Sequence, residues 1–569
     1  MRQAGTSSGG LPGALLLLIL ASALGGLHAR AWDLGRRSPA LSFDAAQYAV
    51  AARTLAARGV LATPFALPID LVKHPAPAWP LSVVQPGLVV LEAALDRIVP
   101  PWAPWPGGGD FSTPERREWL PLVISFACYV ALGLAIARAV RRRLEALDPG
   151  NAPGHAWVAA GAGTAFLLDP EAQHLALGGF TELPYTLLLV AALAMLASGR
   201  AARRPFAWGV LLGIAGSVRG NLLGLVPVLA VAAATLAPGR RRRVAGLALL
   251  GFALPLAPWW IYKWRAFGNP GWDLSALALW DGVGGRTWFS LTHRPALPQL
   301  PSGAAGLAAV APKALHNLPS LLAAYALDPA GPWTAVLLAA LAATRKRDRE
   351  RESDPAFRAA RVAAWVVLAH AAFSLAVAAL GAGWRRYLFP ARVPVEAAGL
   401  AAAWLAIARS GALAAGRRRV LAGALVVAVA IGWGGYRTVR GDAEARAAAE
   451  SRGLPSVATL RALSAELDRT LGAGELVMSN LGPTLAWFAR RPVLHLSLGP
   501  EDMPACRRRV PFRRVVLAFR DPAHAWGSWA SLVANPDVAR SHPEWGVERA
   551  RLWLTNDGFR VVWLELEER

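Results

Sequence analysis

A carboxylate and a phenol at helical spacing are the first side chains in this sequence whose types suggest chemistry. Asp44 and Tyr48 lie four residues apart in the run FDAAQY, so a helix would present both on one face. Such a pair can hydrogen-bond to a substrate or exchange a proton with it. The competing interpretation is structural. Ser42 precedes the run, and an acidic residue in a first helical turn is favoured by the helix dipole.

Further acidic and basic residues lie at or near the ends of predicted membrane spans. Asp169 and Glu171 fall at the end of one span, and Glu182 lies inside the next. A carboxylate at membrane depth is costly, so Glu182 either marks a functional site or pairs with a basic residue such as Arg219. The basic and aromatic side chains at the same side are Arg219, Arg385, Arg386, Tyr387 and Arg392. Because arginine binds phosphate oxygens in a bidentate manner, they predict a phosphate site, with surface snorkelling as the alternative.

The first long polar segment also contains the adjacent residues Lys73 and His74, just before an apolar run. His74 could act as a base or bind a metal, but one histidine without carboxylates at ligand spacing assigns no metal site. The sequence contains no Walker loop, dinucleotide glycine fingerprint, zinc-protease helix or nucleophile elbow. Soluble nucleotide-driven chemistry is therefore not expected.

Tryptophans crowd the region after residue 258. An aromatic belt at a membrane interface explains Trp259, Trp260 and Trp264. A platform that stacks against sugar rings is the alternative for Trp272, Trp280 and Trp288.

The elements that must position these residues are membrane spans. Of the 569 residues, 55% are hydrophobic and only 17% are charged, and the apolar residues form blocks too long for a soluble core. We expect eleven spans, near 11–29, 119–139, 155–169, 174–198, 206–218, 221–237, 244–261, 330–344, 358–381, 388–408 and 419–436. The stretch 206–237 is predicted to be a hairpin that turns at Ser217 to Asn221.

The net charge of +23 indicates topology more than a binding partner. Its densest runs are short and lie between apolar blocks, at 141–143, 200–204, 240–243, 345–351 and 417–419. A nucleic-acid-binding protein would gather them on one soluble face, so nucleic acid is excluded as a partner. With the N-terminus in the cytoplasm, every run falls on the cytoplasmic side. The first span is expected to be a retained anchor, with a cleaved signal peptide as the alternative.

The predicted domain organisation follows from these spans. Residues 1–437 form a multi-span domain, with outer loops at about 30–118 and 262–329, and residues 438–569 form a small soluble domain. Strand-like runs are expected at 475–479, 492–496, 515–519 and 561–566, and helices at 457–471 and 483–490. The fold class is therefore an all-α polytopic membrane protein with a small C-terminal α/β domain outside the membrane.

Taken in order, the segments resemble the C-type membrane glycosyltransferases, the superfamily of protein mannosyltransferases and aminoarabinose transferases. The segments that carry the resemblance are FDAAQYAVAARTLAARG, KHPAPAWPL, GGFTELPYTLLLV, LLGIAGSVRGNLLGLVP, PLAPWWIYKWRAFGNP, WRRYLFPARVP and GELVMSNLGPTLAWFARRPVLHL. Many relatives have Asp-Glu in the first loop and His-Pro-Pro after it. Here Asp44 is followed by Ala45, and His74 by Pro75 and Ala76.

The resemblance implies a C-type glycosyltransferase fold and a sugar donor linked to a polyprenyl phosphate. It implies that Asp44 is the general base and that transfer proceeds with inversion. Lys73, Arg219, Arg385, Arg386 and Tyr387 would bind the donor phosphate. Asp169, Glu171 and Glu182 would be supporting acidic residues, and Tyr48 and His74 further first-loop residues. No cofactor is assigned, and a divalent metal stays open.

We therefore expect a multi-pass enzyme of the bacterial inner membrane that acts on the periplasmic face, where the C-terminal domain also lies. Its partners would be the membrane, the lipid-linked donor and an acceptor that is a lipid, a glycan or a protein. The alternative is a polytopic transporter or lipid flippase, which would show pseudo-symmetric halves and broken helices. A third hypothesis is an envelope-assembly protein whose soluble tail performs the binding.

Overall fold

The computed structural model describes residues 41–103, 110, 112–147, 152–328, 330–347, 354–381, 385–409 and 454–568. These residues divide into two compact units. The helical unit takes its described residues from Ile124–Trp259 and Ala314–Ala449. The sheet unit takes them from Arg36–Val123, Trp260–Lys313 and Glu450–Arg569.

This division groups segments that are distant in the sequence. Most of the first predicted outer loop, part of the second and the C-terminal segment belong to the same sheet unit. The domain boundary expected between residues 437 and 438 lies outside the described residues. The sheet unit therefore assembles from separate stretches of the sequence, and does not consist of one continuous segment.

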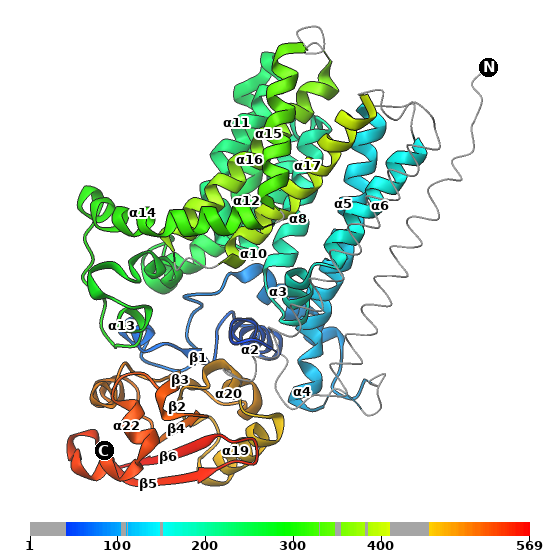
Figure 1. Ribbon diagram of the computed structural model, residues 1–569. Helices are drawn as coiled ribbons and strands as arrows, with labels where there is room; N and C mark the ends of the chain where they lie inside the picture. Colours follow the sequence, from blue (N-terminus) through cyan, green and yellow to red (C-terminus); the bar gives the residue numbers. More distant parts are fainter. Residues whose placement is uncertain are drawn as a thin grey trace. The chain divides into compact units, whose positions relative to one another are not determined.

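Apolar α-helices make up the helical unit (Figure 1). They are α5 (Trp119–Leu147), α6 (Ala152–Leu167), α7 (Pro170–Leu177), α8 (Glu182–Ala197), α9 (Arg200–Arg203), α10 (Pro205–Val218), α11 (Val226–Thr235), α12 (Arg241–Phe267), α14 (Gly303–Leu327), α15 (Ala330–Arg347), α16 (Pro355–Leu380) and α17 (Phe389–Arg409). Among the described residues, three 3-10 helices join them: η4 (Gly220–Gly224), η5 (Pro238–Arg240) and η9 (Arg385–Leu388). By residue number, α5, α12 and α14 contribute to both units.

Within the described residues, three helical segments are long and apolar enough to cross a membrane: Pro114–Ala146, Pro238–Phe267 and Pro355–Leu380. Two bent pairs, α7 with α8 and α14 with α15, also qualify when each pair is taken as one span. Nine of the eleven predicted spans overlap described helices, and those at 11–29 and 419–436 lie outside the described residues. The molecule is thus helical, with several helices suited to a bilayer.

The predicted span at 174–198 is not continuous. α7 and α8 meet at an angle of 118° across a short break. Gly178 and Gly179 lie in that break, and Gly179 has a left-handed φ of 69°, which a residue with a side chain rarely adopts. Glu182 therefore begins a helix at the break, where a span at 174–198 would have placed it inside a continuous helix.

The predicted hairpin near residue 219 is present. α10 ends at Val218, Arg219 has an extended backbone, and the η4 turn follows before α11 begins. α10 also packs closely on α12, because a Cβ atom at Gly209 would collide with the carbonyl oxygen of Ala248. A glycine at this position allows the two backbones to approach.

A six-stranded mixed sheet forms the centre of the sheet unit (Figure 1). Its strands are β1 (Phe65–Ala66), β2 (Val477–Ser479), β3 (Val493–His495), β4 (Arg514–Phe519), β5 (Val547–Leu554) and β6 (Arg560–Leu566), in the order β1-β3-β2-β4-β6-β5. β1, β3, β2 and β4 are parallel, whereas β6 is antiparallel to both β4 and β5. β1 comes from the first predicted outer loop, and pairs Phe65 with Val493.

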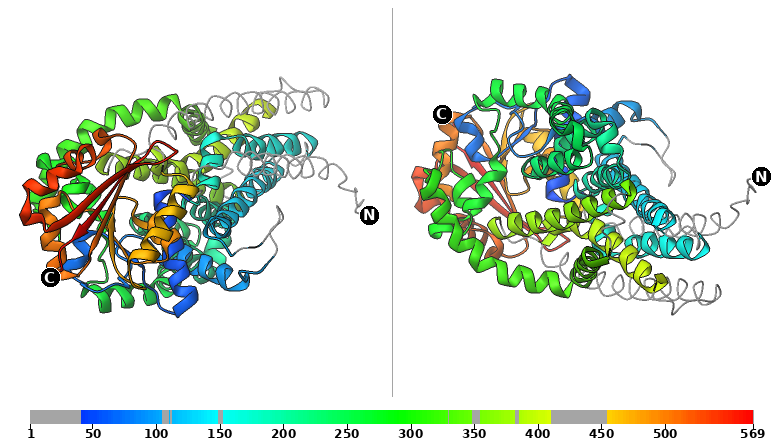
Figure 2. Two further views of the ribbon diagram at one scale, coloured as in Figure 1. Left: turned by 90° about the horizontal axis from the view of Figure 1, so that it is seen from below. Right: turned by 90° about the horizontal axis from the view of Figure 1, so that it is seen from above.

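The sheet unit also contains shorter helices. They are α2 (Phe43–Arg58), α3 (Pro86–Ile98), α4 (Pro114–Arg117), α13 (Trp288–Thr292), α19 (Val457–Thr470), α20 (Gly482–Ala489), α21 (Met503–Arg509) and α22 (Trp529–Ala534). α20 packs against both α2 and α19, and the view from below shows α19 and α20 in gold beside the blue α2 (Figure 2). Leu71 and Trp79 of the first loop share one buried core with Met478, Leu494 and other residues of the C-terminal segment.

Candidate functional site

Both units contain predicted site residues, and each unit is described by itself. Asp44, Tyr48, Lys73 and His74 belong to the sheet unit. Asp169, Glu171, Glu182, Arg219, Arg385, Arg386 and Tyr387 belong to the helical unit.

Asp44 lies in the first turn of α2. The Ser42 side chain caps this helix by accepting a hydrogen bond from the backbone N–H of Ala45 at 3.2 Å. Asp44 and Tyr48 are both half-buried, one turn apart on the helix. The predicted helix and its capping residue are therefore present, and the carboxylate lies where the helix dipole favours a negative charge.

Residues of β1 and of the C-terminal segment contact α2 near both of its ends. At the start, the Phe43 ring packs edge-on against Phe65 and His495, with ring centroids 5.9 and 5.6 Å apart. Near the other end, the Arg53 guanidinium donates to the carbonyl oxygens of Ala486 and Trp487 at 2.7 and 2.8 Å. These carbonyls belong to the last turn of α20, where a cation is favoured. The position of Asp44 thus depends on residues more than 400 positions away in the sequence.

A buried carboxylate organises the backbone before Lys73 and His74. The 3-10 helix η2 (Pro68–Val72) contains Asp70, whose side chain accepts from the N–H of Leu67 at 2.9 Å. Its backbone carbonyl accepts from the N–H groups of Lys73 and His74 at 3.1 and 3.0 Å. Burial raises the pKa of Asp70 to about 6. The sequence analysis missed this residue, although an aspartate inside the apolar run PIDLV is a visible signal.

Lys73 and His74 both contact residues of the segment after Trp260. The Lys73 ammonium lies 5.3 Å from the centre of the Trp272 ring, a cation–π contact. Nε2 of His74 donates to the carbonyl oxygen of Ala266 at 2.6 Å. Trp272 is itself stacked on Phe267, so its ring is engaged by neighbours of the same unit. No group of three or more potential metal-binding side chains occurs among the described residues.

In the helical unit, four predicted residues form one cluster around the buried carboxylate of Glu182. Arg219 pairs with Glu182 at 2.7 Å, and Nε of Arg386 lies 4.0 Å from the same carboxylate. The Tyr387 ring lies under both guanidinium groups, at 5.1 Å from Arg219 and 5.8 Å from Arg386. The side chains of Glu182 and Arg219 are only 3% and 11% exposed. Arg385 begins η9, directly before this cluster in the sequence.

The guanidinium groups of Arg219 and Arg386 both approach the carboxylate of Glu182 in this cluster. Arg219 and Tyr387 also line a small pocket together with Tyr185, Asn221, His370 and Ser374. His370 is buried, and its Nδ1 has no hydrogen-bond partner among the described residues. The pocket therefore offers cationic, aromatic and neutral polar groups to a ligand.

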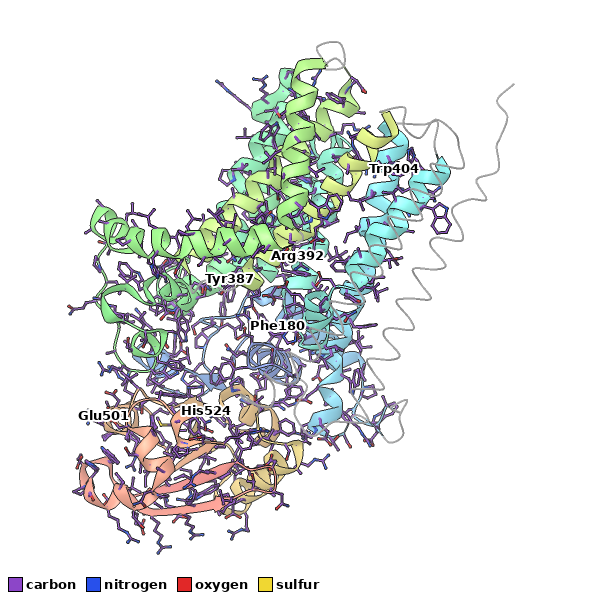
Figure 3. The ribbon with its side chains drawn as sticks, in the orientation of Figure 1. Phe180, Tyr387, Arg392, Trp404, Glu501 and His524 are labelled. Atoms are coloured by element: carbon purple, nitrogen blue, oxygen red, sulfur yellow. The ribbon has the colours of Figure 1, made fainter. Side chains whose placement is uncertain are left out.

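Asp169 and Glu171 belong to a separate network centred on Arg392. Arg392 forms an ion pair with Asp169 and lies 2.7 Å from Glu171, 3.5 Å from Asp328 and 3.4 Å from Glu396. Asp169 also caps α7 by accepting from the N–H of Glu171 at 2.8 Å. Figure 3 labels Arg392 and Tyr387 near the start of α17, with Trp404 towards its other end. The structure thus places Glu182 with the basic cluster, and Asp169 and Glu171 in the Arg392 network.

No protein-family model matches this sequence, and no curated protein matches it significantly. Solved structures with a similar fold do exist. ArnT from Cupriavidus metallidurans, bound to undecaprenyl phosphate, aligns with a TM-score of 0.53 and 15% identity, over 97% of this chain and 97% of that chain.

The oligosaccharyltransferase of Archaeoglobus fulgidus is similar in the same way. Its structure tethered to an acceptor peptide aligns with a TM-score of 0.54 and 13% identity, over 97% of this chain and 74% of that chain. Its complex with an inhibitory peptide and a dolichol-phosphate aligns with a TM-score of 0.51 and 13% identity, over 96% of this chain and 74% of that chain. At these identities the likeness is one of fold, and it extends over nearly the whole chain.

Proposed function

We propose that this protein is a membrane glycosyltransferase that moves a sugar from a polyprenyl-phosphate-linked donor to an acceptor hydroxyl. The observation that carries the proposal is the cluster of Arg219, Arg386, Tyr387 and Glu182, which gathers two guanidinium groups and a phenol among apolar helices. A lipid phosphate is an anion attached to an apolar chain, and it matches both properties. The fold likeness to a structure bound to undecaprenyl phosphate supports this assignment.

Phosphate binding by this cluster follows from its composition. Guanidinium groups form bidentate, charge-assisted hydrogen bonds with phosphate oxygens, and a low-dielectric surrounding strengthens them. Glu182 pairs with Arg219 and so holds its guanidinium in place. In the proposed reaction Arg219, Arg386 and Arg385 stabilise the charge that develops on the departing phosphate, and Tyr387 lines its site.

Asp44 is the proposed general base. Its carboxylate takes the proton of the acceptor hydroxyl while that oxygen attacks the anomeric carbon of the sugar. The bond from the anomeric carbon to the phosphate oxygen breaks, and its electron pair leaves with the polyprenyl phosphate. Attack opposite the leaving group inverts the configuration at the anomeric carbon. Tyr48, one helical turn from Asp44, is proposed to hydrogen-bond to the same substrate.

The proposed location is the bacterial inner membrane, with the active site and the C-terminal segment in the periplasm and the N-terminus in the cytoplasm. The arginine runs at 141–143, 200–204 and 240–243 support this orientation under the positive-inside rule. The acceptor is proposed to be an envelope lipid, glycan or protein.

Replacing Asp44 tests the proposal. We expect Asp44→Asn to abolish glycosyl transfer in proteoliposomes supplied with the polyprenyl-phosphate-linked sugar pool, with membrane insertion and donor binding retained. Asp537→Asn is the matched control, because Asp537 is an exposed aspartate of the same unit. Mass spectrometry detects the product, and NMR gives its anomeric configuration. Full activity of Asp44→Asn removes Asp44 as the base, and retained configuration overturns the single-step mechanism.

A lipid flippase is the second candidate, and one observation favours it. α7 and α8 form a broken span, and broken helices line the substrate sites of many transporters. Liposomes with a fluorescent polyprenyl phosphate in one leaflet separate the two functions. Movement of this lipid without any glycosylated product supports the flippase, and glycosylated product without movement supports the transferase.

A further inference from the structure

A pocket of about 570 Å³ opens in the sheet unit, away from the residues assigned above. It lies between α19, the C-terminal end of α20 and the beginning of α4, and Thr113 and Pro114 of the first loop form one wall. Nε1 of Trp487 donates to the carbonyl oxygen of Pro114 at 3.1 Å, which ties α20 to that wall. The volume is typical of pockets that bind small molecules.

The charged residues of this pocket are mostly arginines. Arg461, Arg490 and Arg491 line it, against one carboxylate, Asp468. Arg491 pairs with Asp468 at 2.9 Å, and Arg461 pairs with Glu115 next to the pocket. Arg490 donates only to the carbonyl oxygen of Ser112, at 3.3 Å, and pairs with no carboxylate in the described parts of the chain. The pocket therefore keeps unneutralised positive charge at Arg490.

The backbone of Arg490 is also unusual. Arg490 follows the last residue of α20 with a left-handed φ of 51°, a conformation that normally favours glycine. Only one other described residue that is not glycine, Ala78, has a positive φ. Such a conformation costs about 1 kcal/mol or more, and residues that adopt it are concentrated at functional sites. An arginine at this position suggests that its side chain is needed there.

The positive potential of Arg490 reaches α2. The pKa of Arg53 is lowered to about 10, mainly by burial and next by repulsion from Arg490. Arg53 binds the last turn of α20. It lies nine residues after Asp44 in α2, which is roughly 13 Å along the helix axis. The pocket edge and Asp44 are therefore connected by one rigid helix within the same unit.

Other groups of the pocket suit a sugar ring. Phe488 and alanines supply apolar surface. Oγ1 of Thr113 is buried without a hydrogen-bond partner among the described residues, so it is available to a ligand hydroxyl. A sugar has apolar C–H faces and many hydroxyl groups, and it can use both.

We propose that this pocket binds a part of the acceptor that is remote from the hydroxyl reacting at Asp44, and that this part is a saccharide carrying a phosphate or a carboxylate. The acceptor role rests on the proposed transferase function, whereas binding of the anionic saccharide is measured independently of transfer. Arg490, helped by Arg461, binds the anionic group, and the sugar ring lies against the wall that contains Phe488.

The test uses the full-length protein in detergent and isothermal titration calorimetry. The probes are glucose 6-phosphate, glucuronate, glucose and inorganic phosphate. We expect saturable, salt-sensitive binding of at least one of the two anionic sugars, at least tenfold tighter than that of glucose or inorganic phosphate. Glucose 6-phosphate and glucuronate distinguish a phosphorylated from a carboxylated acceptor. Absence of saturable binding of both anionic sugars, or equal binding of glucose 6-phosphate and inorganic phosphate, overturns the proposal.

Variants of Arg490 locate the site. Arg490→Gly removes the guanidinium and relieves the left-handed backbone, so we expect a stable protein whose affinity for the anionic sugar falls about tenfold, as for loss of one charge-assisted hydrogen bond. Arg461→Ala should weaken binding in the same direction. Arg508→Ala is the matched control, an exposed arginine on α21 of the same unit, and should bind as the parent does. Unchanged affinity in both Arg490→Gly and Arg461→Ala overturns the site assignment.

Asp44→Asn separates this proposal from the transferase proposal. It should bind the anionic sugar normally and lack transfer. If Asp44→Asn still transfers sugar and binds the anionic sugar normally, Asp44 is not the base and the proposed binding pocket stands. If the parent protein transfers sugar but does not bind the anionic sugar, the pocket proposal is wrong and the transferase proposal stands.

Discussion

At the scale of single residues, the Glu182–Arg219 pair shows how a buried carboxylate is stabilised by an arginine. A lone carboxylate at membrane depth is costly, and the sequence therefore suggested either a functional site or a pair with Arg219. The pair is present at 2.7 Å, and Arg386 adds a second cation. Pairing stabilises Glu182, and the two guanidinium groups beside it make the cluster a candidate phosphate site.

Replacement of Arg219 by lysine tests that role. Arg219→Lys keeps the charge and the pair with Glu182 but removes the bidentate fork. We expect the KM for the lipid-linked donor to rise roughly tenfold, with a smaller change in kcat. Arg392→Lys is the matched control, because Arg392 is bound to four carboxylates in a different network. It should lower the melting temperature and leave the donor KM unchanged. An unaltered donor KM in Arg219→Lys contradicts the phosphate assignment.

Asp70 makes a prediction about pH. Its pKa is about 6 in the folded protein because of burial, above the usual value of an aspartate. A raised carboxyl pKa means that the folded state favours the protonated form. The contribution of Asp70 to the free energy of unfolding is fully present below pH 4 and is lost as the pH rises through 6. The total loss is roughly 3 kcal/mol. Asp70→Asn removes this titration, so its melting temperature should change less between pH 4 and 7 than that of the parent. Parallel melting curves for the two proteins would contradict this.

Residue types and spacing identified part of the candidate site. Asp44 and Tyr48 on one helix, and Glu182 next to Arg219, followed from local pattern and from the cost of a buried charge. The Arg392 network did not, because it joins helix ends that are far apart in the sequence, at Asp169, Asp328 and Glu396. The same holds for the pocket at Arg490, whose wall comes from the first loop.

At the scale of elements, the position of α2 depends on the beginning of α20. Gly482 has a left-handed φ of 48°, and a Cβ atom there would lie 2.9 Å from Cε2 of Phe43. Phe43 directly precedes Asp44, so a shift of its ring moves the proposed base.

Gly482→Ala should therefore reduce both stability and activity. We expect a loss of about 1–3 kcal/mol in the free energy of unfolding and a fall in transfer rate. Gly558→Ala separates the two causes, because Gly558 also has a left-handed φ but open space around it. Gly558→Ala should lose stability because of the left-handed backbone, and its transfer rate should stay unchanged. Equal transfer rates in the two variants would show that Phe43 does not transmit the change.

Sequence pattern identified most elements of the C-terminal segment. Strands β2, β3, β4 and β6 and helices α19 and α20 coincide with the predicted runs within about two residues. β1 was missed because two residues carry no periodic pattern. β5 was missed because it is a largely exposed edge strand, rich in charged residues, whose only partner in the sheet is β6. The break between α7 and α8 depends on the backbone of Gly179, which hydropathy does not detect.

At the scale of the whole molecule, the sheet unit is built from three separate stretches of sequence. The first loop contributes β1 and part of the buried core, including Leu71 and Trp79. The C-terminal segment is therefore not expected to be an independent binding module.

Deletion of residues 454–569 tests this expectation. It exposes the first-loop side of the shared core and removes the partner of β1, so we expect an unstable, protease-sensitive protein without transfer activity. The isolated segment 454–569 should also fail to fold alone, and co-expression of the two pieces should restore protease resistance. A deletion variant that is folded and active would contradict the shared core and also the hypothesis of a binding tail.

The pairing of β1 with β3 has a consequence for biosynthesis. Phe65 is made early and its partner Val493 is made near the end, about 430 residues later. At roughly 5–20 residues per second, the first loop waits about 20 to 90 s for its partner strand. During that time its unpaired strand and apolar core residues are exposed, and such surfaces are bound by chaperones. A ribosome that stops before residue 493 releases a chain in which β1 lacks its partner strand, so the loop bearing Asp44 cannot reach the arrangement described here.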